Sequence, residues 1–240
     1  MANSYFQFKQ FRIEQGQCAM KVCTDACVLG AAAYLSEDTR LLDIGTGTGL
    51  LALMAAQRNP AIRIDAVEID ELAAAQAIDN VTASPWPERI KVHGMSLAQF
   101  AGTQPEPFDH IISNPPFFRH SLRSPDVART TARHTATDTL SFEALIAFTA
   151  QYLTHSGRLT ILLPPPEMHH FEQTAALGGF FPSVQLELHH RLGSRANRHI
   201  TTFTRMPVAT KSHSLAIYTE TGSAYSPEFK ALLRDFYLAF

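Results

Sequence analysis

The sequence has few of the features that mark secreted or membrane-spanning proteins. No stretch approaches the roughly 20 consecutive apolar residues that a membrane-spanning helix needs, and the region after Met1 has no apolar run of signal-peptide length. We therefore expect a soluble, cytoplasmic protein without a membrane partner.

Cysteine is also scarce. The three cysteines, Cys18, Cys23 and Cys27, are odd in number and close together, which does not resemble a disulfide framework. They lack the C-x₂-C spacing of zinc and iron–sulfur sites, and none of the eleven histidines shows an H-x₃-H or H-E-x-x-H spacing. We therefore expect no metal site.

Size and charge set two further limits. The chain has 240 residues, of which 45% are hydrophobic, enough for one sizeable core, so residues 1–240 are predicted to form a single domain. We also expect a monomer. The net charge of −2 argues against a surface coated with nucleic-acid-binding charge, although it permits a local basic patch.

Strand-like and helix-like segments alternate through the first two thirds of the chain, which predicts a parallel sheet with crossover helices. The predicted strands are Leu41–Ile44, Ile64–Val67, Ile90–His93, His110–Ser113 and Leu159–Leu163. The predicted helices are Leu50–Arg58, Glu71–Ala83 and Leu140–Thr154.

The pattern changes after Leu163. Three further runs, Ser183–His190, Asn197–Arg205 and His213–Thr219, are predicted to be strands joined by short polar connections, as in hairpins. A final helix is predicted after Ser226, where a capping residue and a proline precede apolar residues at helical spacing.

A glycine-rich turn follows the first predicted buried strand, in Asp43-Ile44-Gly45-Thr46-Gly47-Thr48-Gly49. Glycines at Gly45 and Gly47 let backbone approach a ligand, while the next helix directs its first amides at the turn. The third glycine falls one position too early for a dinucleotide fingerprint, and Asp43 would repel a pyrophosphate but attract an ammonium group. The pattern resembles motif I of class I methyltransferases that use S-adenosylmethionine.

Two more positions complete the predicted cofactor site. Glu68 ends the second strand, where an acid can hold ribose hydroxyls, and Ser96 follows the third strand, where relatives often carry an acid that accepts from the adenine amino group. A bare strand–helix turn and a nicotinamide dehydrogenase remain alternative interpretations of this motif.

The second motif, Asn114-Pro115-Pro116-Phe117, ends another buried strand. The Asn114 side-chain oxygen and the Pro115 carbonyl can each accept a hydrogen from an NH₂ group, and proline rigidity fixes both acceptors. Phe117 can stack on a planar target. The motif resembles motif IV of methyltransferases that act on amino groups of nucleobases or on glutamine amides, although Pro-Pro could simply end the strand.

The N-terminal stretches Phe6–Phe11 and Cys18–Asp25 resemble the opening of bacterial tRNA adenine-N6 methyltransferases, which modify adenine 37 of a valine tRNA. The resemblance continues to Asp235–Leu238. It implies a Rossmann-like class I methyltransferase fold, with a mostly parallel seven-stranded sheet and helices on both faces. It also implies that residues 1–40 pack near the cofactor site, with Lys21 and Asp25 close to the methionine end of S-adenosylmethionine.

Two basic clusters could hold the phosphates of a valine tRNA anticodon arm around an extruded base. The first, after the substrate motif, contains Arg119, Arg123, Arg129 and Arg133. The second contains His189, His190, Arg191, Arg195, Arg198 and His199. Either cluster could instead be an ordinary solvated surface.

The predicted function is therefore transfer of a methyl group from S-adenosylmethionine to N6 of adenine 37. The same motifs would serve a methyltransferase that acts on guanine N2 of rRNA or on a protein glutamine. They would also fit a non-catalytic subunit that binds S-adenosylmethionine or RNA.

Overall fold

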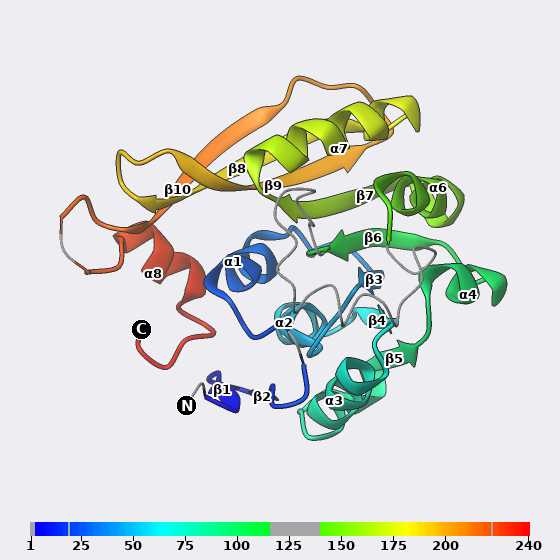
Figure 1. The fold of residues 1–240 in the computed structure, drawn as a ribbon, viewed down its shortest axis with the longest axis horizontal. Coiled ribbons are helices and arrows are strands. Elements are labelled where there is room, and N and C mark those ends of the chain that lie inside the picture. The colour runs from blue at the N-terminus through cyan, green and yellow to red at the C-terminus, as the bar shows by residue number, and fades with distance from the viewer. Residues whose placement is uncertain (1–2, 19, 116–139, 222) are drawn as a thin grey trace, which may run out of the picture.

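The computed structural model describes residues 3–18, 20–115, 140–221 and 223–240 (Figure 1). The strands are β1 (Tyr5–Gln7), β2 (Arg12–Glu14), β3 (Arg40–Ile44), β4 (Arg63–Glu68), β5 (Ile90–Gly94), β6 (Phe108–Ser113), β7 (Leu153–Leu163), β8 (Phe181–Arg191), β9 (Ala196–Thr204) and β10 (Lys211–Tyr218). The helices are α1 (Thr24–Ala32), α2 (Leu50–Arg58), α3 (Glu71–Thr82), α4 (Leu97–Gly102), α6 (Phe142–Tyr152), α7 (Pro165–Leu177) and α8 (Pro227–Leu233), with a short 3₁₀ turn at Pro87–Arg89.

One sheet organises the molecule, in the strand order β10-β8-β9-β7-β6-β3-β4-β5. Five of its pairings are parallel, and only β7–β9 and β8–β9 are antiparallel, so the predicted mostly parallel sheet is confirmed. The sheet has eight strands, which correspond to the eight predicted strand segments, whereas the family resemblance implied seven. The extra strand is β10, which pairs with the outer side of β8 because Leu215 and Ile217 are buried on the face that α8 covers.

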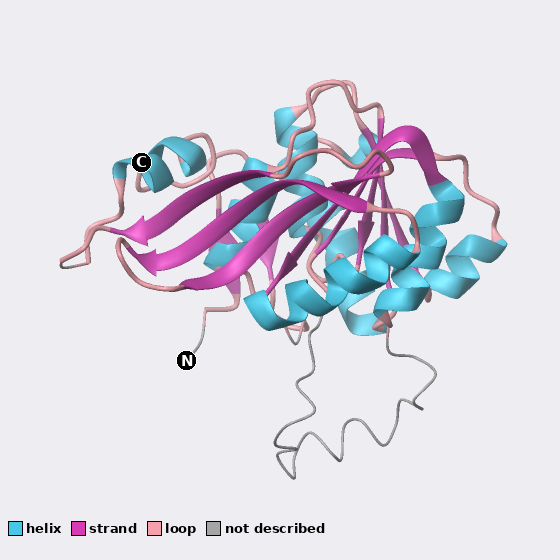
Figure 2. Ribbon diagram, turned by 90° about the horizontal axis from the view of Figure 1, so that it is seen from above, coloured by secondary structure: helices cyan, strands magenta, loops and turns pink. Residues whose placement is uncertain are grey.

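Helices cover both faces of the sheet (Figure 2). Side chains alternate along each strand, so neighbouring residues such as Leu41 and Leu42 enter different apolar clusters. One cluster packs against α1, α2 and α8, and the other packs against α4, α6 and α7. Both faces are therefore buried, as expected for parallel strands linked by crossover helices.

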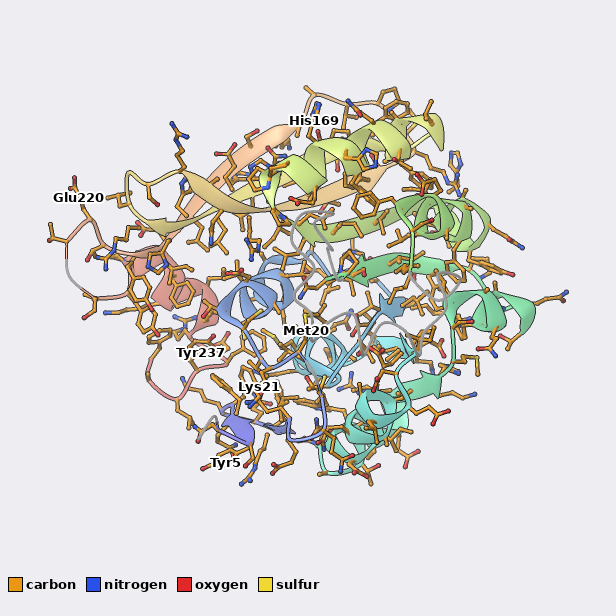
Figure 3. The ribbon with its side chains drawn as sticks, viewed as in Figure 1. Tyr5, Met20, Lys21, His169, Glu220 and Tyr237 are labelled. Atoms are coloured by element: carbon orange, nitrogen blue, oxygen red, sulfur yellow. The ribbon has the colours of Figure 1, made fainter. Side chains whose placement is uncertain are left out.

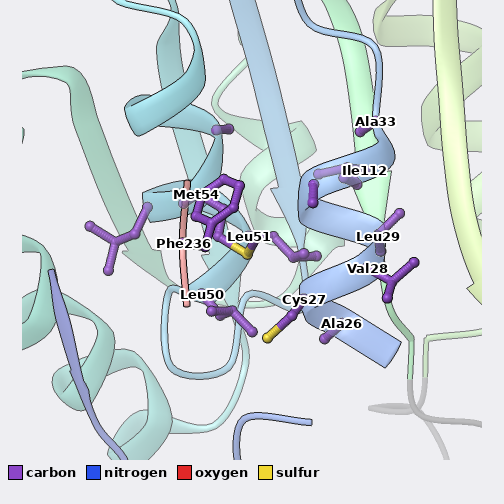
Figure 4. Packing of buried hydrophobic residues seen from close by; sticks show 14 of the residues in the cluster. Ala26, Cys27, Val28, Leu29, Ala33, Leu50, Leu51, Met54, Ile112 and Phe236 are labelled. Atoms are coloured by element: carbon purple, nitrogen blue, oxygen red, sulfur yellow. The ribbon is translucent and has the colours of Figure 1, made fainter. Parts of the chain in front are cut away.

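Helix α1 packs closely against helix α2. A Cβ atom on Gly30 of α1 would lie 2.6 Å from Met54 Sδ of α2, so glycine permits this close approach. Cys27 and Leu51 are buried in the same interface (Figure 4). Burial raises the pKa of the Cys27 thiol to about 12.

Three predictions for the second half of the chain need correction. Helix α6 ends at Tyr152, because Leu153 already begins β7. Helix α7 was not predicted, since only Met168, Phe171 and Ala175 of it are buried and the triple proline at its start suggests a loop. Strands β8 and β9 form the predicted hairpin, but β10 pairs with β8 in parallel, so no hairpin joins β9 to β10.

Within the described ranges, no helix is long and apolar enough to cross a membrane. The same residues contain no group of three or more His, Cys, Asp or Glu side chains that could hold a metal ion.

Candidate active site at the carboxyl edge of the sheet

The loop between β3 and α2 has the backbone geometry that its glycines predict. Gly45, Gly47 and Gly49 have φ angles of 72°, 57° and 82°, in the left-handed region that disfavours other residues. The amides of Gly45 and Thr46 donate to the Val67 carbonyl at 2.8 and 3.1 Å, which fixes the loop against the end of β4. At Gly45 and Gly47, which are partly exposed, the loop therefore presents backbone without a side chain at the carboxyl edge of the sheet.

Asp43 lies beneath this loop and is fully buried. Its Oδ2 accepts from the Thr46 hydroxyl at 2.5 Å, whereas Oδ1 has no hydrogen-bond partner among the described residues. Burial raises the pKa of the Asp43 carboxyl to about 7, and the nearby Glu68 charge adds to the effect. An unpartnered buried carboxylate oxygen is costly, and a nearby positive charge would lower that cost.

Glu68, at the end of β4, connects this loop to the next one. Its Oε2 accepts from the Gly47 amide at 2.8 Å, and its Oε1 accepts from the Asp70 amide at 3.0 Å. A carboxylate can accept further hydrogen bonds at both oxygens, so Glu68 keeps capacity for ligand hydroxyl groups while it holds the loop.

The substrate motif begins beside the cofactor loop. Ile44, the last residue of β3, pairs with Ser113, the last residue of β6, and the Ser113 hydroxyl donates to the Ile44 carbonyl at 2.7 Å. Gly45 and Asn114 therefore each follow the last residue of two adjacent strands, which lie about 5 Å apart. Asn114 is partly exposed and Pro115 is buried. Phe117 lies outside the described residues.

Ser96 has a structural role that the sequence analysis missed. Its hydroxyl accepts from the Gln99 amide at 3.2 Å, and its own amide donates to Gln99 Oε1 at 2.9 Å. These reciprocal bonds form a capping box at the start of α4. The pattern S-x-x-Q just before a helix was the available signal.

The segment that leads from β2 into α1 carries Met20 and Lys21, both exposed (Figure 3). Asp25 is in the first turn of α1, and its Oδ2 lies 3.1 Å from Nε of Arg198 on β9. Partial burial raises the pKa of Asp25, while the Arg198 charge opposes that rise. The structure thus pairs Asp25 with a residue of the second basic cluster.

Cys18 is a neighbour of the cofactor loop that sequence reasoning treated only as a possible metal ligand. A Cβ atom on Gly47 would lie 3.8 Å from the Cys18 sulfur. Burial raises the pKa of the Cys18 thiol, and the charges of Glu68 and Asp70 raise it further. The N-terminal segment therefore packs against the loop through Cys18.

The structure describes only the second of the two predicted basic clusters. The first, Arg119, Arg123, Arg129 and Arg133, lies outside the described residues. The second is divided between the two faces of the sheet, because successive residues of a strand alternate. Arg198 pairs with Leu188 and points towards α1, whereas His199 pairs with Glu187 on the opposite face.

Comparison with known proteins shows the family to which this chain belongs. Residues 28–186 match the family model of the methyltransferase small domain. Proteins named tRNA1(Val) (adenine(37)-N6)-methyltransferase from Dyadobacter fermentans and Tolumonas auensis are each 43% identical to this chain. These alignments cover 99% of this chain in both cases, and 99% and 98% of the relatives.

The chain therefore belongs to the methyltransferase family of these relatives. Solved structures agree on the fold: a predicted O-methyltransferase from Agrobacterium tumefaciens superposes with a TM-score of 0.63 at 20% identity, covering 88% of this chain and 96% of that one. A putative RNA methyltransferase from Pyrococcus horikoshii gives a TM-score of 0.53 at 18% identity, covering 76% and 82%. The family's class I methyltransferase fold and the glycine loop at the carboxyl edge are consistent with each other.

Proposed function

We propose that this chain transfers a methyl group from S-adenosylmethionine to N6 of adenine 37 in a valine tRNA. The observation that carries the proposal is the pairing of Ile44 with Ser113, which sets the glycine loop beside Asn114. A methyl donor bound on the loop and an amino group held by Asn114 would then be neighbours. The full-length similarity to proteins named for this reaction supports the choice of substrate.

The cofactor residues are Asp43, Gly45, Thr46, Gly47 and Glu68, with Lys21, Asp25, Ser96 and Asn114 at the margins of the site. S-adenosylmethionine supplies an electrophilic methyl group on a cationic sulfonium. The site fits such a cation, because Asp43 Oδ1 is buried without a partner within the described ranges of the chain, and little lies within 4 Å of an added Cβ at Gly45 or Gly47. Glu68 would hold the ribose hydroxyls through its remaining lone pairs.

Asn114 and Pro115 orient the amino group that is methylated. The nitrogen lone pair of adenine N6 is delocalised into the ring, so the side-chain oxygen of Asn114 and the carbonyl of Pro115 each accept one N–H and favour a pyramidal nitrogen. The amine loses its proton after the methyl group has transferred, so no general base is required. Phe117 stacks on the extruded adenine, and Arg119, Arg123, Arg129 and Arg133 bind the flanking phosphates.

Methyl incorporation into unmodified valine tRNA tests the proposal directly. We expect labelling of the transcript with adenine at position 37 and none of the same transcript with guanine there. Mass spectrometry of the digested product should show N6-methyladenosine. Equal labelling of both transcripts would contradict the assigned nucleotide. Labelling of rRNA or of a protein, with none of the tRNA, would instead indicate one of the other amino-group substrates.

A further inference from the structure

Asn80, near the end of α3, is a buried amide with three hydrogen bonds to backbone groups. Its Nδ2 donates to the Glu14 carbonyl and to the Thr48 carbonyl, both at 2.9 Å. Its Oδ1 accepts from the Glu14 amide at 2.8 Å. The side chain is 2% exposed, and both of its N–H groups and its oxygen are bonded.

The partners of Asn80 belong to two different parts of the chain. Glu14 is the last residue of β2, which lies beside α3 (Figure 1). Thr48 is in the glycine loop, where α3 also packs closely, since a Cβ atom on Gly49 would lie 3.6 Å from the Ala77 Cβ. Asn80 therefore joins the N-terminal segment and the glycine loop to one helix.

The segment that follows β2 returns to the glycine loop. Gln15 is buried, and its Oε1 accepts from the Val22 amide at 2.9 Å, which ties together the two ends of the segment. Cys18 is within the segment, and a Cβ atom on Gly47 would lie 3.8 Å from the Cys18 sulfur. Holding β2 on α3 therefore also holds Cys18 against the loop.

A second buried amide of α3 contacts the same segment. Gln76 precedes Asn80 by four residues, so both side chains are on one face of the helix. The Gln76 Oε1 accepts from the Gln17 amide at 3.4 Å. Buried polar side chains are favourable only when they are bonded, so these two amides specify where the N-terminal segment lies.

We propose that Asn80 is a positioning residue for the cofactor: it holds the glycine loop and the N-terminal segment together as one preformed site, and the affinity for S-adenosylmethionine depends on it. The proposal rests on the proposed function, because it takes S-adenosylmethionine as the ligand of the loop. A preformed site binds without the cost of ordering its loops. Without the Asn80 amide, binding would have to order both segments, so the affinity would fall.

Asn59 provides a matched control at the opposite end of α2. Its Nδ2 donates to the Leu35 and Asp38 carbonyls at 2.7 and 2.8 Å, and its Oδ1 accepts from the Ala61 amide at 2.9 Å. It thus makes the same three kinds of bond as Asn80 and is also buried. Asn59 directly follows α2 and Gly49 directly precedes it, so the two residues are about 15 Å apart.

Alanine at each position tests the proposal by calorimetry. We expect Asn80→Ala to raise the Kd for S-adenosylmethionine about tenfold, because the ordering cost is added to binding. Asn59→Ala should leave this Kd unchanged. Both variants should unfold at a lower temperature than the unmodified chain, since each leaves buried backbone groups without a partner.

Thiol alkylation of the cofactor-free protein, followed by mass spectrometry, gives a second measurement. Cys18 is buried beside the loop, Cys23 is exposed, and Cys27 is buried between α1 and α2. In Asn80→Ala, Cys18 should react about tenfold faster relative to Cys23, because the N-terminal segment opens locally. Cys27 should stay protected. Asn59→Ala should not change the Cys18 rate.

Equal Kd values for the two alanine variants would overturn the role of Asn80 in cofactor binding. If the unmodified chain does not bind S-adenosylmethionine, the proposed function fails, whereas faster alkylation of Cys18 in Asn80→Ala would still support the anchor itself. Asn80→Asp and Asn59→Asp form a milder pair, for use if an alanine variant does not fold. A carboxylate keeps the accepted amide bond and loses the two donated bonds, so the same differences are expected.

Discussion

Two buried carboxylates near the two ends of β3 have opposite environments. Asp38, two residues before the strand, accepts from His110 Nδ1 at 2.9 Å and from Arg158 Nη2 at 3.0 Å. Asp43, within the strand, accepts from the Thr46 hydroxyl at Oδ2, and its Oδ1 has no hydrogen-bond partner in the part of the chain that the structure describes. Both side chains are at most 2% exposed, so burial alone does not distinguish them.

The hydrogen bonds around Asp38 continue through the sheet. His110 is fully buried, and its Nε2 lies 2.8 Å from the Thr160 hydroxyl, which in turn lies 3.0 Å from the Thr202 hydroxyl. Burial lowers the pKa of His110, so the neutral ring can donate to Asp38 and accept from Thr160. The buried polar groups around Asp38 are therefore bonded to one another, whereas Asp43 keeps one carboxylate oxygen without a partner among the described residues. We infer that Asp38 serves stability and that Asp43 serves binding.

Removing the Asp38 charge should have the largest effect on stability. Asp38→Asn leaves Arg158 without its buried partner, and loss of one member of a buried ion pair costs about 3–5 kcal/mol. Urea unfolding should show this loss, while the Kd for S-adenosylmethionine of the folded variant should not change. Asp235→Asn, at an exposed carboxylate, is the control and should be neutral. If folded Asp38→Asn bound S-adenosylmethionine more weakly, the distinct roles inferred for Asp38 and Asp43 would be contradicted.

At the carboxyl edge, Asn114→Ala should separate chemistry from binding. The turnover number should fall about 10²–10³-fold, the scale for losing one preorganised polar group that acts in the transition state. Cofactor affinity and thermal stability should stay close to those of the unmodified chain. If single-turnover rates fell only a few-fold while tRNA binding collapsed, Asn114 would be a docking residue.

Asp43 should make stability depend on pH. Its pKa is about 7 in the folded chain against 3.8 for the free group, so the folded state binds the proton more tightly and stability is lost as the pH rises through this range. Between pH 5 and 8 the loss from this group is about 3 kcal/mol, to order of magnitude. Asp43→Asn should remove this loss in urea unfolding measured at both pH values. An unchanged pH dependence would show that Asp43 is already ionised at pH 5.

The same carboxyl should couple cofactor binding to pH in the opposite sense. A cationic ligand favours the ionised form of Asp43, so the affinity for S-adenosylmethionine should increase as the pH rises through about 7. Calorimetry across pH 6–8 should show this increase in the unmodified chain and not in Asp43→Asn. If Asp43→Asn is stable but binds S-adenosylmethionine more weakly, this result would support a role for Asp43 in cofactor binding.

The smallest expected effect comes from the loop backbone. Gly47 has a φ angle of 57°, where a β-branched residue is strained, so Gly47→Val should raise the Kd for S-adenosylmethionine about tenfold. Gly102→Val is the control, since Gly102 has an ordinary φ and no atom lies within 4 Å of an added Cβ. Unchanged affinity in Gly47→Val would exclude this loop from the cofactor site.

The sequence was most informative where one segment carried its own signal. The parallel strands up to β6 have nearly the predicted bounds, because fully buried strands are continuous apolar runs between turns. Helix α7 gave a weak signal because most of its residues face solvent. The pairing of β10 with β8 was not predictable, since period-two alternation identifies a strand but not its neighbour.

The sequence by itself determined the local chemistry: glycines where φ is positive, Asp43 before them, and an amide with prolines after a strand. These features depend on residues adjacent in the chain, whose conformations follow from local sterics. Only the tertiary structure decided that Ile44 pairs with Ser113, that Asp25 contacts Arg198, and that one buried carboxylate is satisfied while the other is not. The two contacts join residues 69 or more positions apart, and the strand order brings these residues together. The difference between the two carboxylates depends on the residues that bury each of them.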